Sequence, residues 1–232
     1  MSLFIQRPEE TSLQEVRGVD SYDTNLRIIL VKSSVESAAQ AFVSLKGMNV
    51  WESNVHEREI EIRRNSTFIL QFKGHPWSLI SVPYSSAEAI DPTGLSSQEI
   101  EKIMFTPLKL KFDLLEADAL RISALLNTCV IFYSASDTLG LTEYQIYKDG
   151  ELEEKFYFQA GSPVEFQSKY RQIETRSIKN VYKFVDEAIR EQNAYIPFLD
   201  SSGNFNIGTR VFLQVGGLAS DEIEQVDYIA RQ

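Results

Sequence analysis

The stretch LLEADALRISALLNTCVIFYSASDTLGLTEYQIYKDGELEEKFYFQA, residues 114–160, decides the fold class of this protein. Its first part, residues 114–126, carries apolar residues at helical spacing and predicts an amphipathic helix. The apolar run 129–133 predicts a buried strand, and residues 142–158 predict two further strands. The triplet Lys148-Asp149-Gly150 joins these two strands and predicts a hairpin, because Gly adopts the positive φ that such turns demand. This order of elements predicts a helix beside an antiparallel sheet.

A similar order of elements precedes this stretch. Residues 26–32 form an apolar β-type run, and Ser33 and Ser34 then offer N-caps for a helix that ends at Gly47. Several short strands are predicted between residues 49 and 82, and they favour a meander. Further along the chain the expected elements are a loop over 84–94, a short helix ending near residue 105, strands over 108–112, 209–215 and 222–230, irregular chain over 161–177, a third helix over 178–193 capped by Ser177, and a loop over 200–204.

We therefore predict an α+β fold with a mainly antiparallel sheet and about three helices packed on one face of it. A doubly wound α/β fold is disfavoured, because three or more strands follow one another without a helix between them. The two strand–helix–meander patterns also suggest two similar units, residues 25–94 and 95–232, after an extended N-terminal arm over residues 1–24. One continuous domain is the alternative.

Composition narrows the classes of function. The chain has 232 residues, of which 43% are hydrophobic, so it can bury a core without disulfides or metal. The net charge of −10 comes from 23 basic and 33 acidic side chains. An acidic surface repels the phosphate backbone, so nucleic-acid binding is disfavoured, and the cluster Lys102, Lys109 and Lys111 is too small to reverse this. A basic protein is the partner that such a surface suits.

The single cysteine, Cys129, excludes an intramolecular disulfide and fits a reducing compartment, so we expect a cytoplasmic protein. The sequence has no apolar run long enough to span a membrane. The first residues lack the apolar core of a secretion signal.

Three groups of residues are candidates for a ligand- or partner-binding site. His75 and Trp77 lie at a predicted hairpin turn, where Trp is a frequent binding anchor. Asp137 and Thr138 follow a buried strand, and Glu143 and Tyr144 come soon after and are expected at the same edge. Each group has a structural alternative: the first two residues can fold a corner and fill the core, and Asp137 with Thr138 can close a turn.

Motifs that carry chemistry are missing from the sequence. His56-Glu57-Arg58-Glu59 lacks the second His of a zinc motif, and the glycines form neither a Walker loop nor a dinucleotide fingerprint. We therefore predict no cofactor, no metal and no catalytic residue.

The sequence favours a non-enzymatic protein-interaction, regulatory or inhibitor- or immunity-type module. One alternative is a hydrolase that uses Asp137 or a Glu together with His75, and another is a small-ligand-binding domain. Residues 128–158 resemble α+β domains of bacteria, and this resemblance implies no activity.

Overall fold

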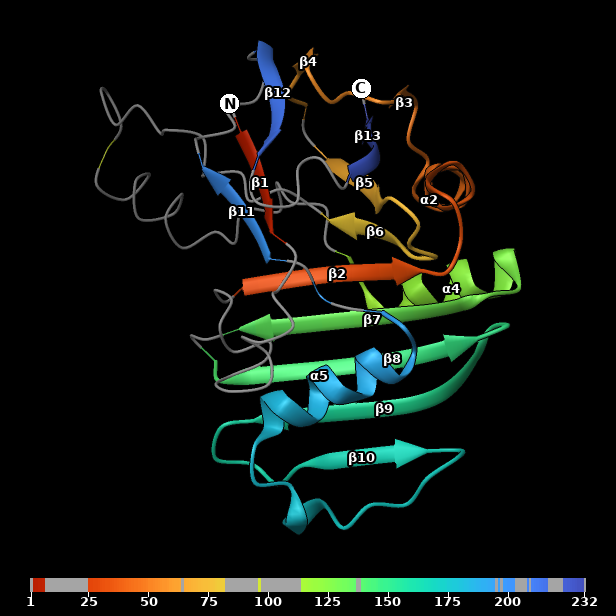
Figure 1. Ribbon diagram of the computed structural model, residues 1–232, viewed down its shortest axis with the longest axis vertical. Helices are drawn as coiled ribbons and strands as arrows, with labels where there is room; N and C mark the ends of the chain where they lie inside the picture. The colour runs from red at the N-terminus through yellow and green to blue at the C-terminus, as the bar shows by residue number, and fades with distance from the viewer. Residues whose placement is uncertain are drawn as a thin grey trace.

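A nine-stranded antiparallel sheet forms the centre of the protein, as a computed structural model shows (Figure 1). The structure describes residues 2–6, 25–63, 65–81, 96, 114–136, 139–194, 196, 198–202, 208, 210–216 and 223–231. The strand order is β10-β9-β8-β7-β2-β6-β5-β13-β3, and each neighbouring pair is antiparallel. The strands are β2 (Asn25–Val31), β3 (Val50–Glu52), β5 (Ser66–Phe72), β6 (Ser78–Ser81), β7 (Cys129–Ser136), β8 (Leu141–Lys148), β9 (Glu151–Gln159), β10 (Glu165–Ser168) and β13 (Ile223–Ala230). The predicted α+β fold with a mainly antiparallel sheet is confirmed.

A second sheet of four strands combines segments from distant parts of the chain. Its order is β11-β1-β12-β4, and the pair β1–β12 is parallel. The strands are β1 (Ser2–Gln6), β4 (Arg58–Glu61), β11 (Phe198–Ser202) and β12 (Arg210–Gly216). The prediction of a loop over 200–204 was therefore wrong for its first residues, since they pair with β1. The expectation that β4 belongs to the meander of residues 49–82 was also wrong, because β4 pairs with β12 in this second sheet.

Helix α2 (Val35–Lys46) begins and ends where the sequence predicted. The Ser34 side chain accepts a hydrogen bond from the N–H of Ser37, and Gly47 closes the helix with a φ of +61°. Helix α4 (Glu116–Leu126) follows the predicted pattern within two residues. Helix α5 (Val181–Glu191) starts later than expected, because Asn180, and not Ser177, accepts the capping hydrogen bond from Lys183. A 3₁₀ turn, η2 (Thr175–Ser177), precedes it.

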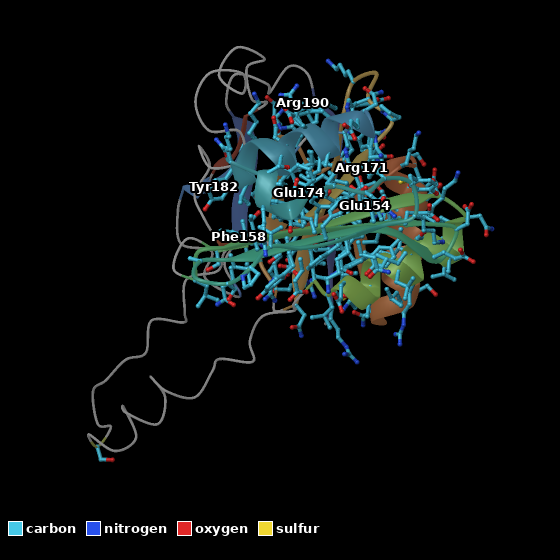
Figure 2. The ribbon with its side chains drawn as sticks, turned by 90° about the horizontal axis from the view of Figure 1, so that it is seen from below. Glu154, Phe158, Arg171, Glu174, Tyr182 and Arg190 are labelled. Carbon is cyan, nitrogen blue, oxygen red and sulfur yellow. The ribbon has the colours of Figure 1, made fainter. Side chains whose placement is uncertain are left out.

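The helices lie on both faces of the large sheet, which corrects the expectation of a single face. Successive strand residues point to opposite faces. Ile28 packs in one buried cluster together with Val185 of α5, while Ile29 packs in another together with Phe42 of α2 and Ile122 of α4. Figure 2 shows the same division, with α5 on one side of the sheet and α2 and α4 on the other. The sheet is therefore the middle layer of three.

A β-bulge near the start of β9 changes which side chains face α5. The register with β8 pairs Ile146 with Glu154 but Tyr147 with Leu152, so Glu153 is the extra residue. In a regular strand Leu152 and Glu154 would share one side. The bulge places Leu152 against the α2 and α4 cluster, and Phe156 remains on the α5 side.

The hairpin turn between β8 and β9 is confirmed, with φ values of +52° at Asp149 and +82° at Gly150. The segment predicted as irregular over 161–177 contains β10, which pairs with β9. The short helix ending near residue 105, the strand over 108–112 and the three lysines of the basic cluster lie outside the described residues. The division into two similar units stays a prediction.

Candidate functional site

The predicted site residues that the structure describes lie at three separate places. His75 and Trp77 lie in the turn between β5 and β6. Glu143 and Tyr144 are neighbours on β8 and point to opposite faces of the sheet, Tyr144 toward α5 and Glu143 toward α4. Asp137 and Thr138 lie outside the described residues.

Trp77 is part of the core. Its side chain is 3% exposed, and the Nζ atom of Lys32 lies 6.0 Å from the ring centroid. Its indole Nε1 is buried, and no residue that the structure describes accepts a hydrogen bond from it. This placement matches the structural alternative for the turn, in which Trp77 fills the core.

His75 and the end of β7 lie at opposite ends of the sheet. The register pairs Val31 of β2 with Ser78, which follows the His75 turn, whereas Ser136 pairs with Asn25 at the other end of β2. At ~3.3 Å per residue the seven residues of β2 separate these ends by about 20 Å. The geometry therefore gives no support to a hydrolase that combines His75 with side chains at the Ser136 end of β7.

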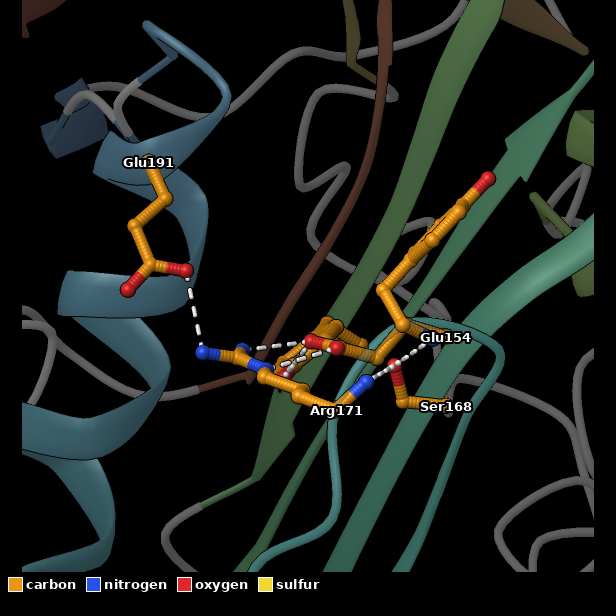
Figure 3. A network of polar contacts seen from close by, with 6 residues as sticks. Glu154, Ser168, Arg171 and Glu191 are labelled. Carbon is orange, nitrogen blue, oxygen red and sulfur yellow. Dashed lines mark hydrogen bonds and ion pairs between the residues drawn. The ribbon is translucent and has the colours of Figure 1, made fainter.

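On the α5 side, Tyr144 belongs to a network of charged side chains. Its hydroxyl donates a hydrogen bond of 2.7 Å to Oε1 of Glu154. Arg171 donates two hydrogen bonds to the same carboxylate, of 2.8 Å from Nε and 2.6 Å from Nη2, and a third of 2.9 Å from Nη1 to Glu191 on α5 (Figure 3). This bidentate geometry is the strongest form of an ion pair between Arg and a carboxylate.

Aromatic rings enclose the guanidinium of Arg171. Its Cζ lies 5.7 Å from the ring centroid of Phe166 and 5.5 Å from that of Phe184. Phe184 in turn packs against Phe156, with 5.2 Å between the ring centroids. The cation is therefore held by two carboxylates and by two aromatic faces, which attract it electrostatically.

These contacts govern the ionisation of the network. Burial alone would raise the pKa of Glu154, but hydrogen bonds from Arg171, Tyr144 and Ser168 outweigh it and hold that pKa below its ordinary value. The same hydrogen bond to Glu154 raises the pKa of Arg171, and burial together with Glu154 raises the pKa of Tyr144. The carboxylate of Glu154 therefore accepts hydrogen bonds from several donors and stays charged. Because Arg171 binds both Glu154 on β9 and Glu191 on α5, the network holds α5 and the chain after β10 against the sheet.

The bulge also gives Glu153 a cationic partner. Its Oε1 lies 3.1 Å from Nζ of Lys169, which also contacts Glu151 at 2.6 Å. Adjacent carboxylates on a regular strand point apart. At this bulge Glu153 and Glu154 both bind cations of the segment after β10. Sequence reasoning missed Glu154, Arg171 and Glu191, because they come together only through the pairing of β10 with β9 and the packing of α5.

On the α4 side, Glu143 lies in a row of polar residues that crosses five strands. The register aligns one residue from each of β2, β7, β8, β9 and β10: Arg27, Ser134, Glu143, Tyr157 and Glu165. In the next row, Gln145 donates a short hydrogen bond to Glu116 of α4 and accepts one from Tyr147. Among the described residues, no helix covers this face of the sheet at the end that carries Phe158 (Figure 2).

Glu143 is the perturbed acid of this face. Burial raises its pKa, and the neighbouring Glu116 carboxylate raises it further, while Lys155, Arg27 and a hydrogen bond with Ser134 only partly offset the rise. Burial, followed by the charges of Glu116 and Glu143, raises the pKa of Tyr147 to about 12. Perturbed acids of this kind concentrate at binding and catalytic sites, although structural clusters produce them as well.

Glu143→Gln is expected to make the protein more stable at pH 7 than the wild type. Because folding raises the pKa of Glu143, the folded state binds more protons than the unfolded state above the ordinary Glu pKa of 4.5. The wild type therefore loses stability as pH rises through the folded pKa, and the variant does not. Urea unfolding between pH 4 and pH 8 measures this difference.

Glu165→Gln is the matched control, since it removes one exposed carboxylate in the same row. An advantage of Glu143→Gln that stays constant down to pH 4 would contradict the pKa argument.

Helix α4 buries two polar residues beside the apolar Ala119 and Ile122, and it exposes two leucines. The buried Asp118 forms an ion pair of 2.5 Å with Lys46, and the buried Ser123 donates to the carbonyl of Thr128 at 2.7 Å. In contrast, Leu120 is 37% exposed and Leu125 is 57% exposed. We call the exposed residues Ala117, Leu120, Arg121, Ala124 and Leu125 the α4 outer face.

Comparisons with protein-family models, with curated proteins and with solved structures find no match to this chain. Among the described residues, no group of three or more His, Cys, Asp or Glu side chains is arranged to hold a metal ion. The helices described here are all too short or too polar to cross a lipid bilayer.

Proposed function

We propose that this protein is a non-enzymatic protein-interaction module and that the α4 outer face is its contact surface. The observation that carries the proposal is that α4 exposes two leucines while it buries two polar residues. A surface helix normally buries its apolar residues and exposes its polar ones. Here Asp118 and Ser123 are buried with partners, while Leu120 and Leu125 face solvent.

The surroundings of the α4 outer face have the composition of an interface. Protein interfaces combine an apolar centre with a polar rim. Glu116 lies one turn before Leu120 on the same side of α4 and contacts Gln145 of the sheet. Glu143 lies close enough for its pKa to respond to Glu116. The rim at this end of α4 therefore offers two carboxylates.

These carboxylates support a basic partner. A Lys or Arg side chain placed between Glu116 and Glu143 would relieve their repulsion, and the net charge of −10 would attract such a partner over a longer range. A partner that presents leucine-sized side chains beside a basic one fits this surface. Regulation or inhibition of a basic protein is the role that such binding serves.

The double variant Leu120→Gln/Leu125→Gln is expected to lose partner binding with its fold intact. Glutamine keeps a good helix propensity, so α4 is retained. Loss of two buried leucine contacts corresponds to on the order of a hundredfold weaker binding. Immobilised wild type and variant are exposed to cell extract, and any protein retained only by the wild type is purified for an affinity measurement at low and high salt.

Leu139→Gln is the matched control, because Leu139 is also strongly exposed but lies in the connection between β7 and β8. The purified partner should bind this control as it binds the wild type, and should bind Glu116→Gln/Glu143→Gln more weakly and with less salt dependence. Equal binding to wild type and to Leu120→Gln/Leu125→Gln would refute the α4 outer face as the contact surface. Loss of binding in Leu139→Gln alone would move the site to the β7–β8 connection.

A further inference from the structure

Tyr170 is an exposed aromatic side chain on a turn that is tied down on both sides. Its side chain is 72% exposed, the highest value among the large hydrophobic residues described. The hydroxyl of Ser168 accepts hydrogen bonds from the N–H groups of Tyr170 at 3.1 Å and Arg171 at 3.3 Å. Lys169 and Arg171 are held by glutamates of β9. The neighbours of Tyr170 are therefore tied to β9 by ion pairs, whereas the Tyr170 ring is presented to solvent.

Such a turn is preorganised for binding. The backbone N–H of Lys169 donates a hydrogen bond of 2.9 Å to the carbonyl of Glu153, which ties the turn to the bulge of β9. A side chain on a fixed backbone loses little entropy when it binds, and Tyr combines a large apolar ring with few rotatable bonds. Tyrosine is accordingly frequent among the residues that dominate binding energy.

The turn adjoins the outer edge of the large sheet. β10 is the outermost strand, and in the part of the chain that the structure describes it pairs only with β9 (Figure 1). An edge strand carries N–H and C=O groups that a further strand can pair with. Phe166 points toward the α5 core, while Glu165 and Gln167 are exposed on the other face. The side chains of β10 thus alternate between the two faces of the sheet, as in a regular strand that can pair with another.

The charge around this edge is negative. The ion-pair cluster beside the turn contains four carboxylates, from Glu151, Glu153, Glu154 and Glu191, against the two cations Lys169 and Arg171. Its net charge is therefore −2. Glu165 on β10 itself adds another exposed carboxylate. A segment that docks here is favoured by basic side chains.

We propose that the edge of β10 and Tyr170 together form a docking surface for an extended, basic peptide segment of a partner protein. The segment adds to the sheet beside β10 by main-chain hydrogen bonds, and one of its apolar side chains packs on the Tyr170 ring. Its Lys or Arg side chains lie near Glu165 and the excess carboxylates of the cluster. This surface is separate from the α4 outer face and does not depend on it.

The test uses defined peptides as probes. Isotope-labelled full-length protein is titrated with a peptide of alternating lysine and valine, and amide chemical shifts report where it binds. Saturable shifts are expected in residues 165–171. A glutamate–valine peptide should bind more weakly because of its charge, and a lysine–valine peptide with a central proline should bind more weakly because proline lacks the N–H that a ladder needs.

Tyr170→Ala should weaken binding of the lysine–valine peptide by about fivefold or more. Phe212→Ala is the control, since Phe212 is an exposed aromatic residue on β12 of the other sheet. Equal affinity of Tyr170→Ala and wild type, or equal binding of the proline-containing peptide, would overturn the proposal. Absence of saturable shifts would also overturn it. Shifts confined to α4 would overturn it as well and would leave the α4 outer face as the binding surface.

Discussion

Arg171→Ala is expected to lower the free energy of unfolding by about 3 kcal/mol, because removal of one partner of a buried ion pair leaves the other uncompensated. Glu154 is only 5% exposed and would keep Tyr144 as its main donor in the core. The variant also loses the contact to Glu191, through which the chain after β10 holds α5. Urea unfolding followed by circular dichroism measures the change.

Lys183→Ala is the matched control for loss of a cation. Lys183 and Glu187 are 3.7 Å apart on one face of α5, and both side chains are more than half exposed. An exposed pair at this spacing contributes about 0.5 kcal/mol or less. Similar losses in Arg171→Ala and Lys183→Ala would show that the Arg171 network does not clamp the fold.

The double variant Arg171→Met/Glu154→Gln separates the value of the ion pair from the cost of an orphaned charge. Replacement of both partners is expected to destabilise the protein less than Arg171→Ala, because no buried charge is left unpaired. Folding lowers the pKa of Glu154, so its contribution to stability is complete above the ordinary Glu pKa of 4.5 and is lost as pH falls through the folded pKa. The double variant should therefore lose less stability below pH 4.5 than the wild type does.

Gly150→Ala is the second large effect, with an expected loss of about 3 kcal/mol from backbone strain and overpacking together. Gly150 has a φ of +82°, a conformation that L side chains rarely adopt. An added Cβ would also lie 2.8 Å from the Cβ of Ala124 on α4, which is too close for two carbon atoms. The hairpin and the helix would have to move apart. This movement would strain the hydrogen bond of 3.1 Å that Ser123 accepts from the Gly150 N–H. Chemical denaturation measures the loss.

Gly47→Ala isolates the backbone part of this effect. Gly47 has a φ of +61°, but an added Cβ would meet nothing within 4 Å. The expected loss is about 1 kcal/mol, as for a left-handed residue without a clash. The excess of Gly150→Ala over Gly47→Ala then measures the contact between the hairpin and α4. If the two variants lose the same amount, the turn does not press on α4 as the structure indicates.

Sequence reasoning found the elements whose signals are local. Ser34 and Gly47 delimit α2 because the capping hydrogen bond and the left-handed residue act within a few residues of each helix end. The Asp149-Gly150 turn was predictable for the same reason. The boundary of α5 was missed, because Ser177 and Asn180 are both acceptable caps and the intervening 3₁₀ turn decided between them.

The candidate site was predictable only in part. Glu143 and Tyr144 were selected from the sequence, but their partners are distant in the chain or hidden by irregular structure. Arg171 lies in a segment without regular periodicity, and it meets Glu154 only because β10 pairs with β9. The one signal available in the sequence was the pair of cations Lys169 and Arg171, two residues apart, which follows the adjacent Glu153 and Glu154 along the chain.

The sequence alone determined where most helices and strands lie, that the sheet is mainly antiparallel and that the net charge is negative. Those properties follow from side-chain alternation, turn residues and charge, which act over short stretches of chain. Only the tertiary structure decided that β13 inserts between β5 and β3, that α5 takes the face opposite α4, and that α4 exposes leucines while it buries Asp118. These outcomes depend on which distant segments compete for the same edge or face, and that competition is settled by packing of the whole chain.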